Sequence, residues 1–443
     1  MFRRVALVLC LVLPVTAPQT NEQKLVSHSG EFRPEIIKVT EGVWVAVGYA
    51  LANAILVEGT DGVIIVDTTE SKTAARAIKA EFDKLSTKPV KAIVYTHNHY
   101  DHINGGEVFA AGGTPAIYAH ELLETLIQHS NAEVANAMLP RNLRQFGALL
   151  PDANRPNAGI GLKLVLDPGG ALTYLKPTQT FTDTLEVTVA GVQMKLVHAP
   201  GETDDQIYVW LPDKKVLFAA DNYYLAFPNL YAIRGTPYRD VRKWRDSVDL
   251  MIAEGPEFLV PSHTRPLAGV ARIKEVLTDY RNAIHSVYMQ TIGGMNRGLG
   301  PDELVQEVKL PADLAAKSHL QEFYGTIPWA VRSIFAGNLG WFDGNPTTLF
   351  PLAPKVRAER IAALAGGKDA LLKRLREASA ANDSQWAAEL ADHVLALEPE
   401  NAEAKSIKAQ ALIALGRAQI SANARNYFMT SAMQLGATPP GYK

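Results

Sequence analysis

Short runs of alternating apolar and polar residues in the first half of the chain predict a succession of β-strands. From Val43 to Asp67 the runs VWVAVG, NAILVEG and VIIVD are separated by turn residues such as TDG, which predicts a meander of strands. The next segment, SKTAARAIKAEFDKL, has helical spacing, and KPVKAIVYTH predicts a buried strand that runs directly into a polar cluster. We therefore expect a sheet covered by at least one helix.

A second group of predicted strands follows. LEVTVAGVQMKLVHAPGE predicts a strand pair joined across AG, QIYVWLPDKKVLFAAD predicts a hairpin across PDKK, and EFLVPSHT predicts one more strand and its loop. Between the two groups, residues 131–180 are rich in Pro, Gly and Asn and show little periodicity. Because long irregular segments in compact domains are usually functional or disordered, we interpret this one as a cover over the site. The whole order predicts two sheets covered by helices.

Helical periodicity replaces the strand signals after about Val270, as in IKEVLTDYRNAIHSVYMQTIGGM. Further on, the segment from ALLKRLREAS to AQALIALG resembles helical hairpins of the tetratricopeptide type, which we expect to pack on the first domain or on a second subunit. At 443 residues the chain is too long for one ordinary core. We predict a signal peptide at 1–20, a catalytic domain at 21–270 and a helical domain at 271–443.

Composition and the first residues indicate an exported soluble protein. Lys+Arg (44) nearly balance Asp+Glu (46), so nothing suggests a nucleic-acid partner. Arg3 and Arg4 precede an apolar run from Val5 to Leu13, which predicts a cleaved signal peptide and a periplasmic or secreted protein. This run is far shorter than the roughly 20 residues that span a bilayer, so we expect no stable membrane insertion. The single cysteine lies within this leader, so any metal site must use His, Asp and Glu.

The motif THNHYDH, at residues 96–102, places four potential metal ligands where a buried strand opens into a loop. In an extended loop His97 and His99 can reach one ion, while Asp101 and His102 lie beyond them and can serve a second. Imidazole and carboxylate ligands suit Zn²⁺. A solvated His-rich loop is the alternative, but the buried strand before the motif and the two glycines after it favour a metal site.

Three further polar residues follow predicted strands: Glu202 in APGETDD, Asp221 in LFAAD and His263 in VPSHT. Each one alone is typical of a cap or a surface position, but together they complete the ligands of two metals. Two ions about 3.5 to 4 Å apart can hold a water or hydroxide at neutral pH, which predicts a hydrolase with two metal ions per chain. Zn²⁺ suits these donors, although an all-His and carboxylate site can also accept iron or manganese. We assign His97, His99 and Glu202 to the first ion, Asp101, His102 and His263 to the second, and Asp221 as the bridge, with Asp101 and Asp221 as the catalytic carboxylates. Asp67, after VIIVD, either orients a ligand or is a plain strand-end carboxylate.

At these residues the chain resembles the metallo-β-lactamase superfamily and, within it, the zinc-dependent alkyl sulfatases. The narrower resemblance rests on THNHYDH, the spacing of 19 between Glu202 and Asp221, NLYAIRG, QFGALLP and the run FYGTIPWAVRSIFAGNLGWFDGNPTTLFPL. That run is similar to the alkyl-sulfatase dimerisation domain. The resemblance implies an α/β fold, an αββα metallo-β-lactamase sandwich followed by an all-α dimerisation domain. Many members carry a sterol-carrier-like domain after it, which we do not expect here.

The family further implies hydrolysis of sulfate esters of alkyl alcohols, two Zn²⁺ per chain and a homodimer held by the helical domain. By motif match, Asn229 and Arg234 hold the sulfate, with Tyr231 between them as a weaker candidate. A planar guanidinium gives forked hydrogen bonds to a tetrahedral oxyanion, although without the family Arg234 would be read as a surface ion pair.

Two departures from the family pattern keep other functions open. Asp221 stands where the family usually has Glu, and Glu202-Thr203-Asp204-Asp205 replaces its usual Thr-Glu-Ala-Pro run. The alternatives are β-lactamase, lactonase or phosphoesterase activity on the same metal site. An alternative of another class is a non-catalytic scaffold that uses the helical repeats, which the complete set of seven ligands argues against.

Overall fold

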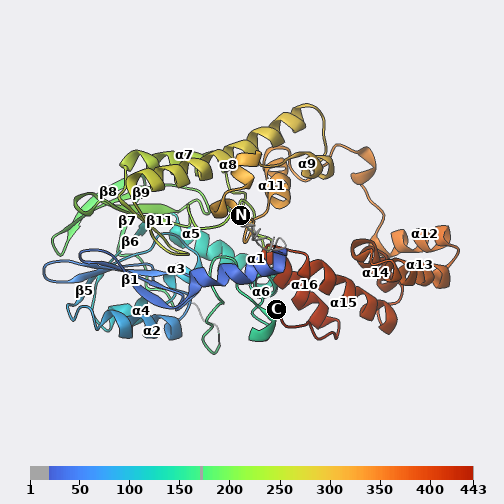
Figure 1. Ribbon diagram of the computed structural model, residues 1–443, viewed down its shortest axis with the longest axis horizontal. Coiled ribbons are helices and arrows are strands. Elements are labelled where there is room, and N and C mark those ends of the chain that lie inside the picture. Colours follow the sequence, from blue (N-terminus) through green and yellow to red (C-terminus); the bar gives the residue numbers. More distant parts are fainter. Residues whose placement is uncertain (1–18, 170–172, 443) are drawn as a thin grey trace, which may run out of the picture.

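The computed structural model describes residues 19–169 and 173–442. Strands between residues 35 and 268 form two β-sheets stacked face to face (Figure 1). Most of the predicted signal peptide thus lies outside the described residues. No helix in the described part of the chain is long and apolar enough to cross a membrane.

The first sheet has seven strands in chain order. Its first four strands are antiparallel neighbours, and the last four run parallel, so that their carboxyl ends meet at one edge. The sequence pattern missed the first strand, which precedes Val43. The strands are β1 (Glu35–Thr40), β2 (Val43–Val47), β3 (Ala54–Glu58), β4 (Val63–Val66), β5 (Val90–Val94), β6 (Ala116–His120) and β7 (Gln179–Phe181).

The second sheet has six strands in the order β13-β12-β11-β10-β9-β8. The predicted turn across AG is the β8–β9 hairpin, where Ala190 and Gly191 both have positive φ, as a tight two-residue turn requires. β11 and β12 run parallel, so their carboxyl ends also share an edge. The strands are β8 (Thr184–Val189), β9 (Val192–His198), β10 (Ile207–Leu211), β11 (Val216–Ala220), β12 (Phe258–Pro261) and β13 (Leu267–Ala268).

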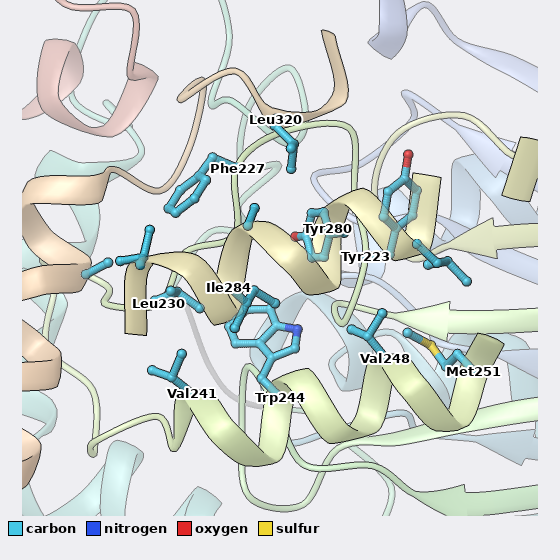
Figure 2. Close-up of a cluster of buried hydrophobic side chains, with 14 of the residues drawn as sticks. Tyr223, Phe227, Leu230, Val241, Trp244, Val248, Met251, Tyr280, Ile284 and Leu320 are labelled. Atoms are coloured by element: carbon cyan, nitrogen blue, oxygen red, sulfur yellow. The ribbon is translucent and has the colours of Figure 1, made fainter. Parts of the chain in front are cut away.

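Apolar side chains from both sheets fill the space between them, as Val45 and Ile55 do from one side and Val209 and Phe218 from the other. Helices cover the two outer faces: α2 (Lys72–Phe82), α4 (Gly106–Ala110) and α5 (Leu123–Gln128) on the first sheet, and α7 (Val241–Glu254) and α8 (Val270–Asn296) on the second. Figure 2 shows the Trp244 side chain of α7 between α7 and α8, close to Ile284. The predicted αββα sandwich is confirmed.

The irregular cover predicted at 131–180 contains a helix that the sequence pattern missed. α6 (Ala135–Gln145) carries Pro140 in its interior, and its mean composition is polar, so neither propensity nor periodicity favoured a helix there. Tertiary packing stabilises it instead, because α16 (Ala422–Gln434) of the helical part lies against it. A π-helical turn at His129–Glu133 precedes α6. Elsewhere, the short α3 (Tyr100–Ile103) follows β5.

The rest of the described chain is helical, as predicted. α8 and α11 (Ile327–Leu339) pack against the outer face of the second sheet. The predicted repeat region forms a small core of its own with α12 (Pro354–Ala365), and it lies apart from the sheets in Figure 1. The amino-terminal α1 (Asn21–His28) lies beside α16 in that view. The remaining helices are α9 (Pro301–Glu307), α10 (Ala312–Ala315), α13 (Lys368–Ala380), α14 (Ser384–Leu397) and α15 (Ala402–Arg417).

His28, at the end of α1, gives the fold a pH dependence. Its ring stacks on Phe323 with centroids 4.0 Å apart, and its Nε2 lies 2.8 Å from the carbonyl oxygen of Gly159. Burial lowers the pKa of His28 from 6.5 to about 4, although the bond to Gly159 opposes the shift. As pH falls below 6.5 the unfolded chain therefore takes up a proton that the folded chain does not, and stability is lost until pH 4.

We expect His28→Gln, which cannot titrate, to remove about 2 kcal/mol of the drop in the free energy of unfolding between about pH 7.5 and pH 5. Urea unfolding at the two pH values measures it. An identical drop in the wild type and the variant would contradict the assignment.

Candidate active site

The motif after β5 supplies four of the predicted metal ligands. β5 ends at Val94, His97 and His99 lie in the loop that follows, and Asp101 and His102 lie on α3. His97 and His102 are fully buried. The change from extended loop to helical turn points the two pairs in different directions around one centre, which suits two neighbouring ions.

Asp67, directly after β4, holds this loop from behind. It is buried and adopts a left-handed φ of 59°, which is uncommon for a residue other than glycine. Its carboxylate accepts hydrogen bonds from the backbone N–H and the hydroxyl of Thr96, both at 2.9 Å, and from the Ser262 hydroxyl at 2.8 Å. It also lies 2.8 Å from Nδ1 of His102. Asp67 therefore orients the imidazole of His102.

The other three predicted ligands come from the second sheet. Glu202 follows β9, Asp221 follows β11, and His263 follows β12. All three side chains are buried. Because β11 and β12 are parallel neighbours, Asp221 and His263 leave the sheet at the same edge, which faces the carboxyl ends of β4 and β5. Both sheets thus present ligands to one place.

The ligands assigned to the second ion converge closely. Oδ2 of Asp101 lies 3.5 Å from Nε2 of His102 and 3.5 Å from Nε2 of His263. Asp221 reaches both imidazoles, with Oδ1 3.6 Å from Nε2 of His102 and Oδ2 3.2 Å from Nε2 of His263. The structure therefore brings Asp101, His102 and His263 together beside Asp221.

The ligands assigned to the first ion surround the other side of Asp221. Nε2 of His97 lies 2.9 Å from Nδ1 of His99 and 3.9 Å from Oδ2 of Asp221. The ligand atoms of His99, Glu202 and Asp221 lie within 4.8 Å of one another, as do those of His97, His102 and Asp221. Asp221 belongs to two of these ligand groups, which is the position that a bridging carboxylate would take.

Metal ions fit these residues because several donor atoms are buried and have no hydrogen-bond partner among the described residues: Nε2 of His102, Nε2 of His263, Oδ1 of Asp221 and Oε2 of Glu202. An unpaired buried polar atom is costly, and a metal ion would satisfy all four. The opposite nitrogen of each of these imidazoles is already engaged, since Nδ1 of His102 meets Asp67 and Nδ1 of His263 lies 2.9 Å from the carbonyl oxygen of Leu51. Such partners fix the tautomer that leaves Nε2 free to bind metal.

Burial and the neighbouring charges set the protonation of the ligands. Burial lowers the pKa of His97 and that of His99 well below the usual value, and Arg234 lowers that of His99 further. Burial raises the pKa of Asp221, but His263 and His102 outweigh it and hold that pKa well below its usual range. Burial raises the pKa of Glu202 to about 7 in spite of Arg239.

Two guanidinium groups border the ligands. Nη2 of Arg234 lies 2.9 Å from Nε2 of His99, so this arginine faces the centre and not the surface. The other is Arg239, which the sequence analysis did not select: its Nη1 lies 2.7 Å from Oε1 of Glu202 and also donates to the carbonyl of Asn229. Nothing in the sequence distinguishes Arg239 from a surface arginine near Asp240; only the fold shows that it is buried.

Asn229 and Tyr231 occupy different places from Arg234. Asn229 is fully buried, and its side-chain amide has no hydrogen-bond partner among the described residues. Its backbone N–H donates to the hydroxyl of Tyr224 at 2.7 Å. Tyr231 lines another hollow, between its own loop and α11, and Trp329 of α11 lines the same hollow. Of the three predicted sulfate ligands, Arg234 is the one that lines the pocket at the metal ligands.

That pocket has a cavity volume of about 60 Å³ and is lined by both polar and apolar side chains. His99, Glu202, Arg234 and Arg239 contribute the polar side. Apolar side chains come from Leu126 of α5, Met138 of α6 and Pro237, and His129 and Ser130 of the π-helical turn also line the pocket. The segment interpreted as a cover thus supplies part of the wall through α6, and the residues just before it supply more.

Comparisons with known proteins agree with this geometry. The model of the metallo-beta-lactamase superfamily matches residues 47–263, and that of alkyl sulfatase dimerisation matches residues 300–437. A linear primary-alkylsulfatase of Pseudomonas sp. (strain ATCC 19151) is 41% identical over 389 residues, which are 86% of this chain and 73% of that protein. An (R)-specific secondary-alkylsulfatase of Pseudomonas sp. is 30% identical over 88% of this chain and 61% of its own length.

The solved structure of the stereoselective inverting sec-alkylsulfatase Pisa1 from Pseudomonas sp. superposes with a TM-score of 0.89 at 28% identity, covering 95% of this chain and 68% of that one. An αββα sandwich with ligand groups at the strand ends defines a hydrolase of the metallo-β-lactamase superfamily. Within it, the chain belongs to the alkylsulfatase family.

Proposed function

We propose that this protein hydrolyses sulfate esters of alkyl alcohols at a site that holds two zinc ions, with a metal-activated water as the nucleophile. The observation that carries the proposal is that two guanidinium groups, of Arg234 and Arg239, line one pocket together with His99 and Glu202, which belong to the set of candidate metal ligands. Nε and Nη2 of Arg239 are buried and have no hydrogen-bond partner among the described residues. The tetrahedral, negatively charged sulfate group of an alkyl sulfate would accept hydrogen bonds from these donors together with those of Arg234.

The chain's own residues divide the work of binding. Arg234 and Arg239 hold the sulfate group beside Glu202 and His99, and their positive charge stabilises the negative charge that develops when the ester bond breaks. Leu126, Met138 and Pro237 give the alkyl part an apolar wall.

Zinc ions, when bound, would supply an activated water and a Lewis acid at the same place. The imidazole and carboxylate donors suit zinc. His102, His263 and the other candidate ligands would hold the two ions. The chemistry that the ions supply would then act at the bound sulfate group and not elsewhere in the pocket.

Hydrolysis of a lactam, a lactone or a phosphate ester is the second candidate function, because Asp221 takes the place of the family's usual Glu. Sulfate release from alkyl sulfates of graded chain length should be measured beside turnover of a cephalosporin, a lactone and a phosphate monoester, in the wild type and in Arg234→Ala. We expect sulfate release to predominate and to fall about 100-fold or more in the variant, since one lost charged donor costs roughly 3 kcal/mol. Lactam or lactone turnover without sulfate release would overturn the proposal, and a protein that takes up no metal would support the scaffold reading.

We also propose that the protein is a homodimer whose partner covers the apolar segment between α11 and α12. Trp341 is 74% exposed and Phe350 93% exposed, and both lie in the region matched by the dimerisation model. Exposed large aromatic side chains in one segment are typical of interaction surfaces.

We expect Trp341→Asp/Phe350→Asp to convert the dimer into a monomer, because the charged side chains would be desolvated in the interface. Sedimentation at several protein concentrations measures the change. The matched control is Leu85→Asp, which alters an exposed leucine shortly after α2 and outside the proposed interface. A wild type that sediments as a monomer, or a double variant that stays dimeric, would contradict this interface.

A further inference from the structure

A buried carboxylate outside the metal ligands lies between β4 and α2. Glu70 is 4% exposed and follows Thr69, whose φ of 69° is in the left-handed region. Among the described residues no basic side chain forms an ion pair with it. Burial raises the pKa of Glu70 to about 7, although backbone N–H groups of Val165 and Leu51 oppose the shift. A buried carboxyl without a basic partner and a strained backbone both cost stability, so their presence beside an active site calls for a function.

The hydrogen bonds of Glu70 lead to a metal ligand. Oε1 accepts from the backbone N–H of Leu51 at 3.0 Å, and Oε2 lies 3.2 Å from the same nitrogen. The carbonyl oxygen of Leu51 in turn lies 2.9 Å from Nδ1 of His263. Glu70 therefore holds the backbone N–H of Leu51, and His263 contacts the backbone carbonyl of the same residue. The position of Leu51 thus fixes the His263 imidazole, whose Nε2 faces Asp101 and Asp221.

The same carboxylate also holds the cover. Oε1 of Glu70 accepts from the backbone N–H of Val165 at 2.8 Å. Nearby, Gly161 packs so closely on Leu51 that a Cβ at Gly161 would lie 2.5 Å from the Leu51 carbonyl oxygen. The cover segment 158–165 is thus fastened to the residue that orients His263.

We propose that Glu70 is a positioning residue that, through Leu51, sets the imidazole of His263 for metal binding and couples it to the cover segment 158–165. The proposal rests on the proposed metal site, and it concerns the affinity of that site and not the identity of the ester. Loss of a partner that orients a metal-bound imidazole typically costs 10- to 100-fold in metal affinity.

Three variants test it. Glu70→Gln keeps an oxygen where Oε1 already accepts from both Leu51 and Val165, whereas Glu70→Ala and Glu70→Met remove the acceptor, the second with little loss of volume. The matched control is Asp167→Ala. Asp167 also fastens the cover, by accepting from the backbone N–H groups of Lys72 and Thr73, but it has no bond to Leu51.

The measurement is zinc bound per chain during dialysis against graded chelator, with the accessibility of the cover followed by limited proteolysis. We expect Glu70→Met and Glu70→Ala to weaken one zinc per chain about 10- to 100-fold and to expose the cover. Glu70→Gln should stay within a few-fold of the wild type, and Asp167→Ala should expose the cover without changing zinc affinity.

Two results would overturn the role of Glu70: wild-type zinc affinity in a folded Glu70→Met protein, or equal loss in Glu70→Gln and Glu70→Met. Because zinc affinity is measured without any ester, a failure of the sulfatase proposal would leave this test intact. A wild type that binds no zinc would instead reject the metal site itself.

Discussion

Asp221→Ala is expected to lose sulfate-ester hydrolysis by at least about 1000-fold and to bind both zinc ions more weakly. Asp221 lies 3.2 Å from Nε2 of His263, 3.6 Å from that of His102 and 3.9 Å from that of His97, so its loss removes a ligand from both sides of the centre. Losing a residue that only supports a ligand costs 10- to 100-fold, and a shared ligand should cost more. Zinc per chain by elemental analysis and kcat/KM for an alkyl sulfate measure the effect.

Asp221→Glu is the informative control, because it keeps a carboxylate and lengthens the side chain by one methylene. We expect it to bind two zinc ions and to keep much of the activity, with a changed kcat as the longer side chain alters the ligand positions. An Asp221→Ala protein that retained two zinc ions and wild-type turnover would show that Asp221 is not shared between the ions.

Arg239→Leu is expected to destabilise the metal-free protein by about 3 to 5 kcal/mol, because it leaves the buried carboxylate of Glu202 without its partner. The two side chains are each 2% exposed and lie 2.7 Å apart. Burial already raises the pKa of Glu202 to about 7 with Arg239 present, so removing the guanidinium should raise that pKa further. Urea unfolding of the chelator-treated protein measures the loss.

Zinc should reduce this cost, since a bound ion would compensate the Glu202 carboxylate in place of the arginine. Arg239→Lys serves as the control that keeps a positive charge and loses the planar fork. Equal destabilisation of the metal-free and zinc-loaded Arg239→Leu proteins would show that Glu202 is not a ligand.

The sequence analysis could select the candidate ligands because their signal is local. His97, His99, Asp101 and His102 stand in one loop, and Glu202, Asp221 and His263 each follow a recognisable strand, so knowledge of strand ends was enough to place them at one edge. Two sheets covered by helices followed from alternating patterns for the same reason, whereas the αββα sandwich was implied by the family resemblance.

The missed features depend on distant parts of the chain. Pro140 concealed α6, whose stability comes from packing against α16 far along the sequence. Arg239 becomes a buried group only because the loop after β9 brings Glu202 to it, and Glu70 acquires its role only through Leu51 and Val165. No local pattern reports such contacts. Tyr231 shows the converse, since its motif placed it beside Arg234 while its side chain lines another hollow.

The most direct test of the central claim is a titration of the metal-free protein with zinc while sulfate release from a linear primary alkyl sulfate is followed. We predict that release is absent without metal and rises to a plateau at two zinc ions per chain. Sulfate release that needs no metal, or none at any zinc concentration in a protein that has bound two ions, would contradict the assignment.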